Sequence, residues 1–427
     1  MKKAIVIGSG AGGATAAREL QGKFEVTILE AGAAFQPFSF SLDTVAKLRK
    51  TGLLFDEREI QLLFPSMRIK KTSDKMVLVF SRCHGGTTTI ATGNALRMDS
   101  DLQKMGINLD AEFAELYQEL PINTDHKNHW KKSTRQLFEI FQQLGLHPIP
   151  TPKMGEYQRC QHCGHCVLGC PSGVKWDSRR FLNIAIEQGA EMVSDCTVEK
   201  ILIEDDQAWG VQARMGFQKK IFKADLIILA AGGLSTPVIL QNSNVPCESR
   251  LFVDPVLCVA AEWPKAGQNR EIPMPFVAQQ DHYILSPYFD HLSFFFNKNW
   301  RLPAENILSL MIKLADTNTG SISHKKLNKY LTETDKSHLR EATEICTEIL
   351  ERMGVKKENI FLGTINAGHP GGMLPLQAAN AQNLHPDVLP ENLYVADATL
   401  FPKSLGNPPI LTIMALAKRI SRVGMNN

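Results

Sequence analysis

The chain has 427 residues, 44% of them apolar, and its 47 basic and 44 acidic residues leave a formal net charge of +3. This composition predicts a globular protein with room for two domains, and so small a charge gives no sign of a nucleic-acid partner. The most apolar run, residues 226–240, is interrupted by Gly232, Gly233 and Pro237, so we expect a cytoplasmic protein without an integral membrane segment.

The N-terminal residues predict a strand–helix–strand unit. Residues 3–7 form a short apolar run typical of a buried parallel strand, and the sequence GSGAGG follows directly at residues 8–13. Residues 14–20 then fit a helix. Residues 24–29 fit a second strand, which ends in Glu30.

This unit has the pattern of a dinucleotide-binding site. Gly8 permits the tight turn, Gly10 lets the backbone approach a pyrophosphate, and Gly13 lets the helix pack close to the strand. The helix N-terminus favours phosphate charge, and Glu30 follows at the distance where a carboxylate accepts ribose hydroxyls. An ordinary glycine-rich turn would leave Glu30 unexplained.

Four cysteines lie within eleven residues. Cys160, Cys163, Cys166 and Cys170, followed by Pro171, have the spacing C-x2-C-x2-C-x3-C-P found in bacterial ferredoxins. The run predicts an iron–sulfur cluster with these four thiolates as ligands, and it favours a 4Fe–4S over a 3Fe–4S cluster.

The ligand set of this site stays open. In two-cluster ferredoxins the fourth cysteine of such a run serves the other cluster, and only one run exists here. Either Cys170 closes the site, or a distant cysteine such as Cys83 completes it, or only three thiolates bind. A structural zinc site, with His162 or His165 as substitute ligands, is the main alternative, followed by free or disulfide-bonded thiols.

A second strand–turn–helix pattern decides between FAD and NAD. Residues 224–230 fit a buried strand, and the sequence AGGLSTP follows at residues 231–237. A strand that runs into paired glycines and a Ser/Thr-Pro helix start resembles the return segment of two-domain FAD-binding flavoproteins. We therefore predict FAD.

The second half of the chain predicts an antiparallel sheet and a long helix. Short alternating pieces, separated by turn residues, fit strands at residues 257–263, 276–279, 282–286, 291–296 and 307–314. Residues 335–353 fit an amphipathic helix with Cys346 on its core face. The aromatic residues Phe289, Phe294, Phe295 and Phe296 fit either an apolar pocket or the core of the sheet.

The C-terminal segment predicts a last strand and helix. Residues 393–396 fit a strand that ends at Asp397. Asn407 is a good N-cap, and Pro408 suits the first helical position. Apolar residues then keep helical spacing from Ile410 to Ile420.

Taken together, these motifs resemble the glucose-methanol-choline (GMC) oxidoreductases in the order of that family. The motifs are the Gly8–Glu30 unit, His84-Gly85-Gly86 with Asn94, residues 231–237, His369-Pro370-Gly371-Gly372 and residues 393–419. The resemblance implies a Rossmann-type FAD-binding domain of the α/β class and a second, antiparallel-sheet substrate domain, hence α+β overall.

The resemblance also implies site residues. His369 and Asn407 match the two catalytic positions that face the flavin ring in the family. A neutral histidine is suited to take the proton of an alcohol, and Asn407 can hold the oxygen by hydrogen bonding. The family further implies cofactor contacts at Gly85, Gly86, Asn94, Asp397 and Pro408.

We expect the FAD-binding domain to be assembled from separate parts of the chain. Residues 1–105 form its first part, 151–255 its second part with the cysteine insertion, and 365–427 its C-terminal part. Residues 106–150 form a substrate or cap segment, and residues 256–364 form the substrate domain.

The leading functional prediction is an FAD-dependent dehydrogenase that oxidises a CH–OH group of a small alcohol-type substrate. Electrons would leave through the iron–sulfur cluster to a protein acceptor or partner subunit. Two alternatives remain open. One is an oxygen-using GMC-type alcohol oxidase with a structural cysteine site, and the other is an electron-transfer flavoprotein subunit of a larger redox complex.

Overall fold

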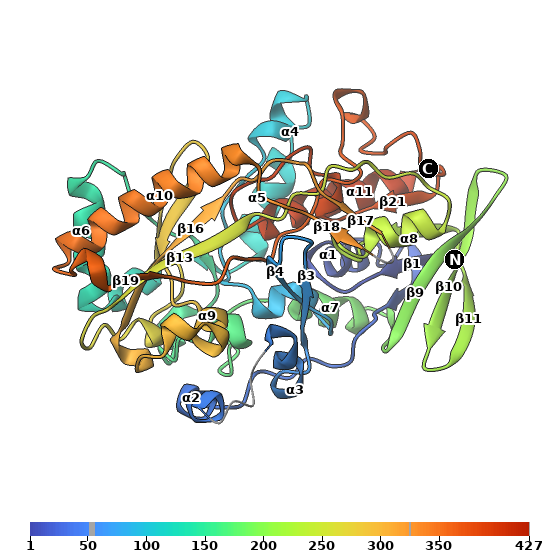
Figure 1. Ribbon diagram of the computed structural model, residues 1–427. Coiled ribbons are helices and arrows are strands. Elements are labelled where there is room, and N and C mark those ends of the chain that lie inside the picture. The colour runs from blue at the N-terminus through green and yellow to red at the C-terminus, as the bar shows by residue number, and fades with distance from the viewer. Residues whose placement is uncertain (51–55, 324–325, 427) are drawn as a thin grey trace.

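A computed structural model describes residues 1–50, 56–323 and 326–426, and two large sheets organise it (Figure 1). The first sheet has five parallel strands in the order β21-β12-β1-β2-β8. Their bounds are β1 (Lys2–Ile7), β2 (Phe24–Leu29), β8 (Glu191–Val193), β12 (Leu226–Leu229) and β21 (Leu393–Val395). Most residues of these strands are apolar, as is typical of parallel strands that have other layers of the protein on both faces.

Helices and a small sheet cover the parallel sheet. Helix α1 (Ala11–Glu19) contacts β1, β2 and β12, and it packs against α7 (Arg179–Glu187) and α11 (Ile410–Asn426). The antiparallel strands β9 (Cys196–Glu204), β10 (Gln207–Met215) and β11 (Gln218–Lys223) form the small sheet, in which β9 contacts β2 and β10 contacts β12. This arrangement confirms the predicted Rossmann-type half of the fold.

The second sheet is antiparallel apart from the β4–β20 pair, which confirms the predicted second architecture. Its order is β3-β4-β20-β13-β16-β15-β14-β6, and β19 also pairs with β13. Helix α10 (Glu333–Arg352) contacts β13, β15 and β16, with Cys346 fully buried in the core as predicted. The strands are β3 (Met67–Lys71), β4 (Val77–Ser81), β6 (Ile149–Pro150), β13 (Pro255–Glu262), β14 (Phe276–Gln279), β15 (Tyr283–Pro287), β16 (Ile307–Leu314), β19 (Ile360–Leu362) and β20 (Asn366–Ala367).

One predicted strand is wrong. Residues 291–296 form the short helix α9 (His291–Phe296). The Asp290 carboxylate accepts a hydrogen bond from the Leu292 N–H at 3.0 Å and another from the Ser293 hydroxyl. This N-terminal cap outweighs the strand preference of three consecutive phenylalanines.

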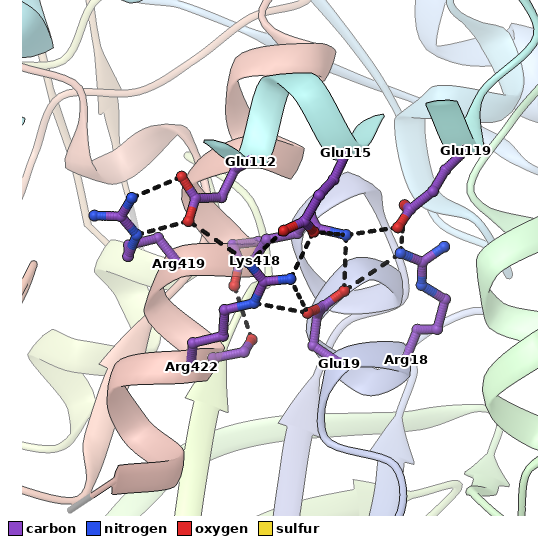
Figure 2. A network of polar contacts seen from close by, with 10 residues as sticks. Arg18, Glu19, Glu112, Glu115, Glu119, Lys418, Arg419 and Arg422 are labelled. Atoms are coloured by element: carbon purple, nitrogen blue, oxygen red, sulfur yellow. Dashed lines mark hydrogen bonds and ion pairs between the residues drawn. The ribbon is translucent and has the colours of Figure 1, made fainter. Parts of the chain in front are cut away.

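A network of charged side chains joins helices α1, α5 (Asp110–Glu119) and α11 (Figure 2). Lys418 is 1% exposed, and its Nζ lies 3.0 Å from a Glu19 oxygen and 2.9 Å from oxygens of Glu115 and Glu119. Arg422 also pairs with Glu115, at 2.6 Å. The figure further shows Arg18, Glu112 and Arg419. The network fixes α11, whose first residue reaches the cavity described below. None of the described helices has the length and apolar character needed to cross a membrane.

Candidate active site

The glycine-rich loop leaves open space at the N-terminus of α1. Gly8 has φ +96°, and a Cβ there would lie 2.5 Å from the Ala230 carbonyl oxygen. A Cβ on Gly13 would lie 2.0 Å from the Gly8 oxygen, so this glycine allows the close packing of helix and strand. A Cβ on Gly10 would meet no atom within 4 Å. This free space, next to the exposed N–H groups of the helix, fits a phosphate group.

Glu30 lies at the end of β2, beside this loop. Its Oε2 accepts hydrogen bonds from the Ser9 N–H at 3.0 Å and the Ser9 hydroxyl at 2.7 Å, and its Oε1 accepts one from the Gly32 N–H at 2.8 Å. Burial raises the pKa of Glu30, and these hydrogen bonds oppose the rise. The carboxylate is therefore held in place at the position expected for a ribose contact.

Gly85 and Gly86 contact the first glycine-rich loop. Gly85 has φ +88°, and its N–H donates to the Ser9 hydroxyl at 3.1 Å. A Cβ on Gly86 would lie 2.9 Å from the Gly10 Cα, so the two loops are in contact. These residues fit an extended dinucleotide that runs from Glu30 past both loops.

Asp397 lies where β21 ends, but protein groups already bind its side chain. The carboxylate accepts hydrogen bonds from the Gly232 N–H at 2.8 Å, the Thr236 hydroxyl at 2.6 Å and the Thr399 N–H at 2.9 Å. Asp397 thus ties the Ala231–Pro237 segment to the C-terminal motif. Its contact with a cofactor stays a prediction.

A cavity of about 150 Å³ is lined in part by strands β3, β4, β13, β16 and β20 of the antiparallel sheet. It brings together three of the predicted site residues, Asn94, His369 and Pro408, although they are far apart in the sequence. Most of the wall is apolar, and it includes Ile60, Met67, Val79, Val256, Leu292, Phe295 and Met311. Of the four phenylalanines of uncertain role, Phe295 lines this cavity, whereas Phe289 and Phe294 lie in the core.

The sheet places three polar residues at one end of the cavity. Strand β13 pairs with β16 on one side and β20 on the other, with Val256 opposite Lys313 and Pro255 opposite Ala367. Asp254 precedes β13 and His369 follows β20, so both lie beside Lys313. Lys313 Nζ is 3.1 Å from Asp254 Oδ2, and His369 Nδ1 is 3.4 Å from the same oxygen.

Burial and the Lys313 charge favour a neutral His369. Burial and the nearby Lys313 ammonium lower the pKa of His369 to about 4, against the opposing effect of Asp254. Burial would raise the pKa of Asp254, but Lys313, His369 and the Ser404 hydroxyl lower it overall. The His369 side chain is still 24% exposed, and it lines the cavity, so a substrate can reach it.

Asn407 does not have the predicted capping role. Helix α11 begins at Ile410, and the first helical hydrogen bond runs from Ile413 N–H to the Pro409 carbonyl. Asn407 Nδ2 instead donates to Gln279 Oε1 at 2.8 Å. The prediction was wrong because a partner on β14 holds the amide. Asn407 is 1% exposed.

The cysteine loop forms part of the cavity wall through Val167 and Leu168. Burial raises the pKa values of Cys160 and Cys166, that of Cys166 to about 12, and nearby thiols of the run add to both rises. Within the described residues, however, no three His, Cys, Asp or Glu side chains are arranged to hold a metal ion. This geometry does not support the predicted cluster or its zinc alternative.

Cys83 is not part of this loop. Its sulfur lies 3.0 Å from the Ser81 hydroxyl and 3.7 Å from the Thr89 hydroxyl, which gives no support to its suggested role as a distant ligand.

Two buried lysines connect the cysteine loop to the cavity. Lys153 Nζ donates to the Asn94 amide oxygen and the Thr92 carbonyl, and Lys175 Nζ donates to the carbonyls of Thr88 and Thr89. All four acceptors are uncharged. Burial lowers the pKa of Lys153 to about 7, and the nearby Cys166 opposes this shift. A negative charge on the thiols would stabilise both ammonium groups.

Comparison with known proteins decides the family. A sequence model of GMC oxidoreductases matches residues 3–271. The chain belongs to the GMC oxidoreductase family. Members of this family bind FAD, and the chain is accordingly an oxidoreductase of the type that acts on CH–OH donors.

Individual relatives and a solved structure are similar over nearly the whole chain. An uncharacterized protein of Methanocaldococcus jannaschii, MJ1450, is 24% identical, with 98% of each chain covered. The long-chain-alcohol oxidase FAO1 of Arabidopsis thaliana is 22% identical over 98% of this chain and 66% of its own length. The crystal structure of pyridoxine 4-oxidase from "Mesorbium loti" has a TM-score of 0.74 at 16% identity and covers 99% of both chains, which shows a common fold.

Sequence reasoning missed three residues of this GMC site, Asp254, Lys313 and His291. A single lysine in the otherwise apolar run ILSLMIKL was the available signal for Lys313, because a buried ammonium requires a partner. Asp254 carries no comparable signal, since the pairing of β13 with β16 brings it to Lys313, and His291 carries none because it lies on a helix that the sequence did not predict.

Proposed function

We propose that this GMC protein holds FAD between the glycine loops and the cavity and oxidises the CH–OH group of an alcohol. Bound FAD would supply the two-electron acceptor. The observation that carries the proposal is that His369 lines the same cavity as Asn94 and Pro408. Asp254 Oδ2 lies 3.4 Å from His369 Nδ1 and 3.1 Å from Lys313 Nζ.

We assign His369 as the catalytic base. His369 Nδ1 is buried, makes no hydrogen bond in the structure, and lies 3.4 Å from Asp254 Oδ2. In this proposal Nδ1–H is donated to Asp254 when substrate binds, and this assigned tautomer leaves the Nε2 lone pair to accept the proton of a substrate hydroxyl. Burial and the Lys313 charge favour the unprotonated imidazole that a base requires.

Asn407 is assigned as the second catalytic residue by its position in the family motif. The bond to Gln279 fixes the orientation of its amide. Asn407 does not line the cavity, so its role as the group that holds the substrate oxygen while His369 takes the proton rests on the family motif alone.

The cofactor assignment uses the loops described above. Gly8, Gly10 and Gly13 would hold the pyrophosphate, and Glu30 would hold the ribose. Gly85, Gly86 and Asn94 would lie along the flavin. Asp397 and Pro408, from the C-terminal part of the chain, would also contact the cofactor.

The route by which electrons leave is a separate question. An iron–sulfur cluster at the cysteine run, with a protein acceptor beyond it, stays a prediction. Its support is the ferredoxin-like spacing and the two buried lysines whose ammonium groups have only uncharged acceptors, whereas the described geometry contains no metal-binding group. Anaerobic purification followed by iron and sulfide analysis and EPR of one sample tests it, since a cluster requires iron and sulfide together.

Anaerobic mixing with a panel of alcohols tests the proposed function. An alcohol substrate should bleach the flavin absorption without oxygen. Peroxide formed on admission of air would favour the oxidase alternative, and reduction of an artificial one-electron acceptor in preference to oxygen would favour the dehydrogenase. An electron-transfer subunit would show neither bleaching by any alcohol nor sensitivity of electron transfer to His369→Ala.

A further inference from the structure

The imidazole of His291, the first residue of α9, is buried without a hydrogen-bond partner. The residue is 4% exposed, and neither Nδ1 nor Nε2 makes a hydrogen bond to protein. The Phe289 carbonyl lies near the ring but outside hydrogen-bond geometry. Burial lowers the pKa of His291 to about 3, so the ring is neutral and offers one donor and one acceptor. Such buried polar groups normally have a partner.

The position of His291 indicates where that partner comes from. His291 lines the same cavity as His369, together with the neighbouring side chains of Leu292 and Phe295. It also lines a much smaller cavity of about 10 Å³ beside Gly164 of the cysteine loop. That smaller space is close to the least volume that holds one water molecule. A larger ligand would therefore approach from the large cavity, and because both ring nitrogens are closed to solvent, the ring or a neighbouring side chain has to move when it binds.

We propose that His291 binds a second, uncharged hydrogen-bonding group of the substrate, a hydroxyl or carbonyl, while the reacting hydroxyl lies at His369. This inference rests on the proposed function, and it names a substrate class: an alcohol with an apolar body and a further polar group at its far end. The aliphatic wall between the two histidines suits the apolar body.

A negative charge at the far end is disfavoured, because Asp290 lines the same cavity next to His291 and its carboxylate would repel an anion. A neutral donor–acceptor group avoids this repulsion, and it also avoids the cost of removing a charge from water.

A matched series of probes tests the inference on the FAD-loaded enzyme. The probes are the straight-chain alkanols from 1-butanol to 1-octanol and the corresponding terminal diols. At one chain length we expect kcat/KM for the diol to exceed that for the alkanol by about tenfold or more, because a pocket built to hydrogen-bond a hydroxyl rejects the analogue that lacks it. His291→Phe should abolish this preference, and His291→Gln should keep part of it, since the amide also offers a donor and an acceptor.

Binding to His369→Ala separates failure of this inference from failure of the proposed function. If the wild-type enzyme oxidises no probe, the proposed function fails. The role of His291 can still be tested, because binding of the same probes to His369→Ala should perturb the flavin absorption. Equal affinity for diol and alkanol at every length would contradict the inference and leave His291 satisfied by water only. Because His291→Phe removes two unpartnered polar atoms, its melting temperature should equal or exceed that of the wild type. A large decrease would show a structural role instead.

Discussion

Asp254 Oδ2 lies 3.4 Å from His369 Nδ1 while it pairs with Lys313 on its other side. In our proposal the carboxylate orients the imidazole when substrate binds, and the ammonium offsets the carboxylate's charge. Burial and the ammonium both lower the pKa of His369, so the proposed base is neutral.

Replacement of Asp254 tests the orienting role. Asp254→Asn should lower kcat for alcohol oxidation by about 10–100-fold, because positioned general-base catalysis contributes factors of this size or larger. Steady-state kinetics measure the effect. The matched control is Asp335→Asn, which alters an equally buried carboxylate in the cap of α10 and should change stability but not kcat. Equal kcat values for Asp254→Asn and wild type would contradict the role.

Replacement of Lys313 tests the electrostatic role. A histidine base acts only when unprotonated, so kcat/KM for the wild type should fall only as the pH decreases toward about 4, the pKa of His369. Loss of the Lys313 charge in Lys313→Met removes a cause of the lowered pKa, so this acidic fall should move up toward the ordinary value near 6.5. The pH dependence of kcat/KM provides the measurement.

Lys329→Met is the control for this shift. Lys329 is as buried as Lys313, but it pairs with Asp316 at 2.7 Å. Removal of the Lys329 charge should leave unchanged the pH at which kcat/KM decreases. A shift of similar size in both variants would show that the effect is general destabilisation.

Two glycines of the first loop should respond in opposite ways. Gly10→Val adds a side chain where no protein atom lies within 4 Å, so the fold should survive while FAD affinity falls at least about tenfold. Gly13→Ala should destabilise the fold itself, because its Cβ would lie 2.0 Å from the Gly8 carbonyl oxygen. FAD titration and thermal unfolding without FAD separate the two effects. Unchanged FAD affinity in Gly10→Val would contradict the placement of the pyrophosphate.

The network of Figure 2 should contribute to stability. Lys418→Met leaves three carboxylates without their shared ammonium, and we expect a loss of about 2–4 kcal/mol, somewhat less than for a fully buried pair. Lys403→Met is the exposed control. It removes one ion pair to Asp101 from a side chain that is 57% exposed, so it should cost at most about 1 kcal/mol. Denaturant unfolding measures both, and equal losses would contradict the special role of Lys418.

Local patterns were sufficient to predict four of the five strands of the parallel sheet, all but β8. The Gly8–Glu30 unit, the strand before Gly232 and the strand before Asp397 each carry their own strand and turn signals, and all three enter one sheet. Helix α9 was missed because its signal is a single capping residue, Asp290, in a sequence otherwise typical of a strand.

The active site could be predicted only where a motif marks it. His369 was found through its glycine-rich motif, whereas Asp254 and Lys313 come to it through the register of β13 with β16 and β20. A one-residue shift of that register would turn these side chains to the other face, and no local pattern specifies it.

The central claim is that a neutral His369 takes the substrate proton during alcohol oxidation. The most direct test is the rate of flavin reduction by an alcohol substrate under anaerobic conditions, in wild type and in His369→Ala with equal FAD content. We predict that reduction in the variant is slower by about 100-fold or more, consistent with loss of a general base. Equal rates in the two proteins would contradict the account.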